Sequence, residues 1–232
     1  MSTKTNYYGS DSLHDTLSEG LNPALTGIGK NNSLGSGFYF YADPFDAEKN
    51  IGEQGLRVSN PAIISGIVEL TSPIVLPVGA TSIRDTRIEI SSREVFRIIS
   101  RNKRVFDDYD SPLTTWGGAK YNRVTKELVN TVCAHYAQPE HFWDLEKEFF
   151  GELGESQLFR SAVADTLGFD GVKQELGNGL SNMVAWFPEQ VSHLDVHRVL
   201  AKPECPSNTY PLIHPNKNRS KINRQFDTNS RE

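Results

Sequence analysis

Three separated segments carry the residues best suited to contact a ligand. The first, Tyr-Tyr-Gly-Ser at 7–10, ends a predicted strand with a glycine that lets a ligand approach the main chain closely. The second is the aromatic run at 38–41, which follows Gly-Ser-Gly and includes Tyr39. The third, residues 169–191, contains Asn182 at the start of an apolar run. Tyrosine and asparagine side chains can hydrogen-bond ligand hydroxyls, but an asparagine amide cannot act as a general base.

Two common kinds of site are disfavoured. The six histidines show no metal-ligand spacing with cysteines or carboxylates, and His193 with His197 is typical of a solvated face, so no metal is expected. Glycine-rich residues 27–37 lack the Lys-Ser/Thr of a phosphate-binding loop, which argues against nucleoside triphosphate hydrolysis. Cys133 and Cys205 form neither a disulfide framework nor a zinc site, and this suggests a reducing compartment.

The elements that must position these segments indicate a mixed α+β domain, with strands at both ends of the chain and helices in the middle. Apolar runs between turn residues predict strands at 6–10, 38–41, 62–70, 73–77, around 172 and at 183–187. Capping residues and helical periodicity predict helices at 12–19, 44–54, 93–101, 118–136, 140–155 and 156–167. Residues 21–37 are expected to form a long loop, of a length that is usually functional or mobile.

Length and charge define the expected organisation. The chain has 232 residues, enough for one substantial core. No apolar run reaches the roughly 20 residues of a membrane span, and no secretory signal is recognisable, so a cytoplasmic location is expected. Residues 1–201, the predicted catalytic domain, hold 18 basic and 26 acidic residues. Residues 202–232 hold six basic and three acidic ones and are expected to form a flexible basic tail.

Taken in order, the three segments resemble the motifs of ADP-ribosyltransferases of the diphtheria-toxin and poly(ADP-ribose) polymerase type, which carry a His-Tyr-Glu set. The matching phrases run from Tyr7 to Val191. They are Tyr-Tyr-Gly-Ser at 7–10, Gly-Leu-Asn-Pro at 20–23, Gly-Ser-Gly-Phe-Tyr-Phe-Tyr-Ala-Asp at 35–43, Phe-Asp-Gly-Val at 169–172 and the segment 182–191. The resemblance implies a split antiparallel β-sheet core with a central helical insertion, and NAD+ as the substrate.

The resemblance also implies roles for individual residues. The main chain of Gly9 would hydrogen-bond the nicotinamide amide, and Tyr8 would hold the ribose with Ser10 beside it. Tyr39 would stack on the cationic nicotinamide ring, because an aromatic face attracts a cation. The cofactor-binding set is therefore expected to be Tyr8, Gly9, Ser10, Tyr39 and Tyr41, and the catalytic set Tyr39, Asn182 and Glu175.

Two departures from the family pattern bear on activity. Tyr8 stands where the family has His, and Asn182 stands where it has Glu. Glu175 and Glu189 are the nearest acids, and Glu175 is favoured as a substitute. Because the nicotinamide–ribose bond breaks through an oxocarbenium-like transition state with a neutral leaving group, positioning and charge stabilisation can supply much of the rate. The site is compatible both with catalysis and with a binder that has lost it.

Arg93, Arg97 and Arg101 recur at i, i+4 and i+8 of a predicted helix and allow two interpretations. They either contact the phosphates of a nucleic-acid acceptor, or form a solvated face that pairs with acids elsewhere.

The function expected from the sequence is mono-ADP-ribosylation of a macromolecule, with nucleic acid slightly favoured over protein. Such proteins are often toxins or phage-defence effectors, which implies an antitoxin or chaperone partner. An NAD glycohydrolase and a non-catalytic domain that binds NAD or a partner are the alternatives.

Overall fold

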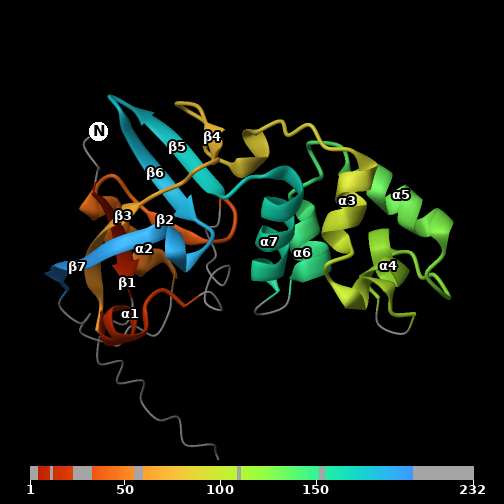
Figure 1. Cartoon of the computed structure of the whole chain (residues 1–232), viewed down its shortest axis with the longest axis horizontal. Coiled ribbons are helices and arrows are strands. Elements are labelled where there is room, and N and C mark those ends of the chain that lie inside the picture. The colour runs from red at the N-terminus through yellow and green to blue at the C-terminus, as the bar shows by residue number, and fades with distance from the viewer. Residues whose placement is uncertain are drawn as a thin grey trace, which may run out of the picture. The chain divides into compact units, whose positions relative to one another are not determined.

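The computed structural model describes residues 5–10, 13–22, 33–54, 60–108, 111–151 and 155–200 (Figure 1). The described strands are β1 (Asn6–Ser10), β2 (Phe38–Phe40), β3 (Ala62–Val68), β4 (Ile74–Leu76), β5 (Gly171–Gly177), β6 (Leu180–Ala185) and β7 (Val191–Val199). The described α-helices are α1 (Leu13–Glu19), α2 (Pro44–Gln54), α3 (Ser92–Ile99), α4 (Pro112–Thr115), α5 (Lys126–Tyr136), α6 (Asp144–Phe150) and α7 (Ser156–Leu167). None of these helices is long and apolar enough to cross a membrane.

The strands form two sheets, with strand orders β1-β3-β7 and β2-β6-β5-β4. Every pairing is antiparallel except that of β4 with β5, which are parallel and are separated in the chain by helices α3 to α7. The α+β class predicted from the sequence is therefore confirmed, with two mostly antiparallel sheets.

The alternation of side chains along β2 gives the four-stranded sheet two different faces. Phe38 and Phe40 are buried in one cluster together with Val68 of β3, so this face packs toward the three-stranded sheet. Tyr39 points the other way and packs against a larger cluster, which joins Val184 of β6 to the helices. The larger cluster includes Val95 and Ile98 of α3, Val132 of α5, Phe149 of α6 and Phe159 of α7. Helices α3 to α7, which lie between β4 and β5 in the chain, form the helical insertion. The four-stranded sheet and this insertion therefore share one core.

Several predicted boundaries change. The helix predicted at 93–101 is α3, which Ser91 caps in a capping box and which ends at Ile99. The helix predicted from residue 118 begins only at Lys126, because Gly117 and Gly118 adopt positive φ and Thr125 supplies the cap. The helix predicted at 140–155 shortens to α6, Asp144–Phe150.

Other predicted features keep their places, and one strand was missed. Gly168 ends α7 with a φ of 78°, as its position after the apolar stripe predicted. Residues 191–199, for which no strand was predicted, form β7, and this strand carries His193 and His197. Both histidines are exposed on this strand, as a solvated face requires. The predicted tail and most of the loop beginning at Leu21 lie outside the described residues.

Candidate functional site

Among the described residues, main-chain pairing joins the two sheets at one isolated pair. Tyr7 of β1 and Tyr41, which follows β2, exchange two main-chain N–H to O=C hydrogen bonds of 2.8 Å each. Beyond this pair β1 continues along β3, whereas β2 continues along β6. A regular antiparallel continuation would have placed Gly9 opposite Tyr39. No ladder pairing joins these two residues, and we call the place where the strands part, between Gly9 and Tyr39, the β1–β2 wedge.

The main chain of Gly9 points into the β1–β2 wedge. Because both polar groups of Tyr7 point toward Tyr41, the alternation of the ladder turns the N–H and C=O of Gly9 to the same side, away from β3. Within the described part of the chain, neither group has a hydrogen-bond partner. Gly9 therefore offers one donor and one acceptor side by side.

Helix α2 closes over Gly9 and explains why a glycine stands there. A Cβ at this position would lie 2.5 Å from the carbonyl oxygen of Ala47 and 2.6 Å from Cγ1 of Ile51. The helix is anchored where it begins, because Oδ1 of Asp43 accepts a 2.8 Å hydrogen bond from the N–H of Phe45. Gly9 allows α2 to lie directly against β1.

The side chains of Tyr8 and Ser10 lie on one face of β1, and Tyr7 and Gly9 lie on the other, since side chains alternate along a strand. The Tyr8 ring packs 5.4 Å from that of Phe40, centroid to centroid. Ser10 is buried, and its hydroxyl lies 2.8 Å from that of Thr16. The structure thus brings Gly9 and Tyr39 to the wedge and turns the side chains of Tyr8 and Ser10 into packing positions.

Tyr39 is held firmly by the turn that precedes its own strand. Its hydroxyl donates a 2.6 Å hydrogen bond to the carbonyl of Gly35 and accepts one of 3.1 Å from the N–H of Leu34. Burial raises the pKa of Tyr39 well above its ordinary value, so the phenol stays neutral. Its ring lies 6.4 Å from that of Tyr41, and the two planes are inclined by 33°. Tyr39 can present an aromatic surface but is unsuited to proton transfer.

Asn182 belongs to a chain of amide hydrogen bonds on the Tyr39 face of the sheet. Its Oδ1 accepts a 3.0 Å bond from the N–H of Ala42, where the chain leaves β2 for α2. Its Nδ2 donates to Oε1 of Gln174 at 3.1 Å, and Nε2 of Gln174 donates to the carbonyl of Ala80 at 2.8 Å. Asn182 therefore positions the end of β2. Gln174 was not predicted as a site residue, and its only signal in the sequence is its place three residues before Gly177, where β5 ends.

Glu175 is separated from Asn182 by the sheet itself. Gln174 shares a face with Asn182, so the next residue along β5 points to the other face. There Oε1 of Glu175 lies 3.5 Å from Nζ of Lys173. The other nearby acid, Glu189, is exposed in the short turn Pro188–Gln190. Neither acid stands beside Asn182 on the Tyr39 face of β5 and β6.

The polar residues of the third motif hold two chain segments together. The carboxylate of Asp170 accepts hydrogen bonds of 2.6 Å and 3.0 Å from the N–H groups of Thr71 and Ser72. Gln190 donates 2.7 Å to the carbonyl of Asp170 and accepts from the N–H groups of Trp186 and Phe187 at 2.9 Å each. These contacts fix the ends of β5 and β6 and so support the strand that carries Asn182.

The arginines of the predicted nucleic-acid face do not act as one row. Arg93 and Arg97 are exposed on α3, whereas Arg101 follows the helix and pairs with Asp165 at 3.0 Å. Two further basic residues of this region, Arg84 and Arg104, pair with Asp144 and Glu155. These three pairs are what the solvated-face interpretation predicts.

Arg93 also borders an apolar groove between α3 and α5, with a volume of about 580 Å³. Phe96, Lys126, Val129 and Cys133 contribute to its lining. Burial raises the pKa of the Cys133 thiol to about 11, so this cysteine is an unreactive part of the lining.

No protein-family model matches the chain, and no curated protein or solved structure is detectably similar to it. Over the described ranges, no group of three or more His, Cys, Asp and Glu side chains is placed to hold a metal ion. The case for a function rests on the β1–β2 wedge.

Proposed function

We propose that this protein is an NAD+-dependent mono-ADP-ribosyltransferase with a split-sheet ADP-ribosyltransferase core. The observation that supports this most is the main chain of Gly9, which turns a donor and an acceptor into the wedge opposite Tyr39. A primary carboxamide such as that of nicotinamide offers the complementary acceptor and donor. A ring held in this way would meet the aromatic surfaces of the wedge, which attract a cation.

The proposed reaction transfers ADP-ribose to a nucleophile on the acceptor. The bond between the ribose C1′ and the nicotinamide nitrogen breaks, and nicotinamide leaves as a neutral molecule with the bonding electron pair. A bond from the acceptor to C1′ forms, and the acceptor proton passes to solvent. Asn182 would hydrogen-bond ribose hydroxyls or hold the site in shape, because its amide accepts no proton at neutral pH. A site without an acidic residue at this position favours a single transfer over chain elongation.

Nucleic acid is the acceptor that we favour, and Arg93 and Arg97 are the proposed phosphate contacts. Both are exposed on one short helix, which suits contact with a phosphate backbone. A cytoplasmic toxin or phage-defence role, with an antitoxin or chaperone as partner, is part of the same proposal.

The test is to incubate the purified full chain with labelled NAD+ and a cell lysate and to measure free nicotinamide and bound label. Tyr39→Ala is the inactivating variant. The matched control is Tyr121→Ala, which removes an exposed tyrosine between α4 and α5. We expect nuclease-sensitive label with the wild type and the control but not with Tyr39→Ala. Protease-sensitive label would assign a protein acceptor instead.

A second candidate, an NAD glycohydrolase, is favoured by one observation. Neither Glu175 nor Glu189 stands beside Asn182 on the Tyr39 face, so neither is placed there to activate a macromolecular acceptor. Nicotinamide release without bound label would support this candidate. The absence of both release and label would overturn the catalytic proposals, and NAD+ binding measured by calorimetry would then identify a binding domain.

A further inference from the structure

Arg160 is a buried cation that lies far in sequence from the segments discussed so far. It belongs to α7, is 1% exposed, and donates from Nη1 to Oγ of Ser36 at 2.7 Å. Ser36 is itself buried, and the two residues are 124 positions apart. The contact joins the helical insertion to the turn before β2.

Burying this guanidinium is costly. Desolvation lowers the pKa of Arg160 to about 10, and the carboxylate of Glu146 on α6 partly opposes that change. Arg160 is therefore still charged at neutral pH. A buried charge is weak evidence for added stability, because its desolvation offsets much of the attraction that it gains. Its use here calls for another explanation.

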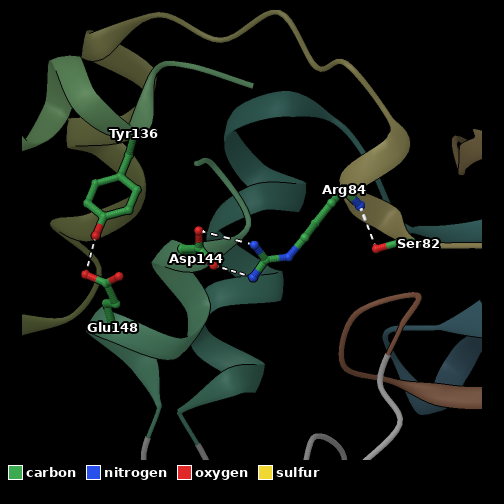
Figure 2. A network of polar contacts seen from close by, with 5 residues as sticks. All are labelled: Ser82, Arg84, Tyr136, Asp144 and Glu148. Carbon is green, nitrogen blue, oxygen red and sulfur yellow. Dashed lines mark hydrogen bonds and ion pairs between the residues drawn. The ribbon is translucent and has the colours of Figure 1, made fainter. Parts of the chain in front are cut away.

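Glu146 of α6 has a buried carboxylate oxygen, whereas the two acids on either side of it in the helix bind other residues. Asp144 binds Arg84, and Glu148 accepts a hydrogen bond from the hydroxyl of Tyr136, as Figure 2 shows. These two contacts fix the rotation of α6 about its axis, and Glu146 lies between them in sequence and on the other side of the helix. Its negative charge contributes to the raised pKa of Tyr39.

The turn that Arg160 holds is the same turn that holds Tyr39. The carbonyl of Ser33 accepts a 2.8 Å bond from the N–H of Ile83, and Leu34 and Gly35 bind the Tyr39 hydroxyl. Gly37 has a φ of 151°, and a Cβ there would lie 2.4 Å from Cγ1 of Val184. The turn thus sits against both the insertion and β6 and has little room to move.

We propose that Arg160 is a positioning residue for Tyr39. By holding Ser36, Arg160 fixes the turn at 33–37. This turn binds the Tyr39 hydroxyl and so fixes the position of the Tyr39 ring at the β1–β2 wedge. The consequence for substrate rests on the proposed function, since it concerns the binding of NAD+. The helical insertion is accordingly part of the substrate site, although none of its residues needs to touch NAD+.

The experiment compares Arg160→Met, Arg160→Lys and Ser36→Ala with Arg104→Met, which removes a partly exposed pairing with Glu155 elsewhere in the insertion. Three measurements are made on each full-length variant: thermal unfolding, hydrogen exchange at the Leu34 amide, and the kcat and KM of nicotinamide release. Ser36→Ala serves as the second variant because it removes the contact while leaving the guanidinium in place.

We expect Arg160→Met and Ser36→Ala to speed exchange at Leu34 and to raise KM for NAD+ by about tenfold, with a smaller change in kcat, because a loosened support misplaces the ring. Arg160→Lys should show smaller increases in Leu34 exchange and in KM than Arg160→Met. Arg104→Met should change neither quantity. Unchanged exchange and unchanged KM in folded Ser36→Ala would overturn the proposal. If the wild type neither binds nor cleaves NAD+, the proposed function fails, and the Leu34 exchange still decides whether Arg160 positions the turn.

Discussion

Gly9 combines two features at one residue: a main chain turned toward the β1–β2 wedge and no side chain beneath α2. We expect Gly9→Ala to destabilise the fold by about 1–3 kcal/mol, because the added methyl meets the Ala47 carbonyl and Ile51. The displaced α2 should also impair NAD+ binding. Urea unfolding measures the first effect, and calorimetry below the unfolding range measures the second. A variant with wild-type stability and affinity would show that the close approach of α2 is not required.

The raised pKa of Tyr39 predicts how stability changes at alkaline pH. In the unfolded chain Tyr39 ionises near the ordinary tyrosine pKa of about 10, whereas in the folded chain Tyr39 keeps its proton. Above that pH the folded state therefore binds more protons than the unfolded state. The free energy of unfolding should therefore fall as pH rises above about 10, by up to about 1.4 kcal/mol per pH unit for this group.

Tyr39→Phe isolates that contribution, since Tyr136 also has a raised pKa and remains in the variant. The decline in unfolding free energy between pH 10 and 11.5 should be shallower in Tyr39→Phe than in the wild type. Below pH 9 the variant should lose about 1–2 kcal/mol through its two missing hydrogen bonds. Identical alkaline slopes would show that Tyr39 ionises normally in the folded protein.

Asn182→Glu tests the residue at which this sequence departs from the ADP-ribosyltransferase motifs that it resembles. A carboxylate at this position still accepts from the N–H of Ala42, and Gln174 can turn its amide nitrogen toward it by giving up the Ala80 carbonyl. We expect nicotinamide release to rise by about tenfold or more, in line with the usual gain from general acid–base catalysis. Asn182→Ala is the control, and it should lower both stability and activity. No gain with Glu would mean that position 182 has a purely structural role here.

At the scale of the elements, α3 carries the proposed contact to the acceptor. Arg93 and Arg97 are exposed on this helix, whereas Arg101 is already paired with Asp165. We expect Arg93→Ala combined with Arg97→Ala to reduce nucleic-acid labelling strongly and to leave nicotinamide release into water unchanged. Arg101→Ala should have little effect. Equal labelling by the double variant and the wild type at both low and moderate salt would remove α3 from the acceptor site.

The pairing of β4 with β5 is the element-level feature that makes the insertion possible. The two strands are parallel, and a parallel pair requires a long crossover connection. In this chain the crossover is the whole group α3 to α7. Because it returns through α7 to β5, Arg160 is brought against the turn that precedes β2.

At the scale of the whole molecule, the larger core cluster contains residues of both the sheet and the insertion. Trp186 at the end of β6 and Trp143 before α6 belong to this cluster. We therefore expect one cooperative unfolding transition for the two parts. Trp143→Phe and Trp186→Phe leave different tryptophans as fluorescent probes, and their unfolding midpoints should coincide with those from circular dichroism of the same variant. Two separated midpoints within one variant would show that the insertion unfolds independently.

The local features of the protein could be predicted from its sequence alone. Apolar and aromatic runs between turn residues predicted β1, β2 and β3, Asp43 and Pro44 predicted the start of α2, and Gly168 predicted the end of α7. These features depend on neighbours along the chain, through side-chain period and capping. The order of the three motifs also predicted which segments would matter for the proposed site.

Which of these residues face one another depends on long-range packing and is seen in the folded chain alone. The single Tyr7–Tyr41 pair turns the Gly9 main chain into the wedge, and strand alternation places Glu175 on the other face from Asn182. The contact between Arg160 and Ser36 joins positions 124 residues apart. Such contacts follow from how sheets and helices pack, and that packing leaves no local pattern in the sequence from which it could be predicted.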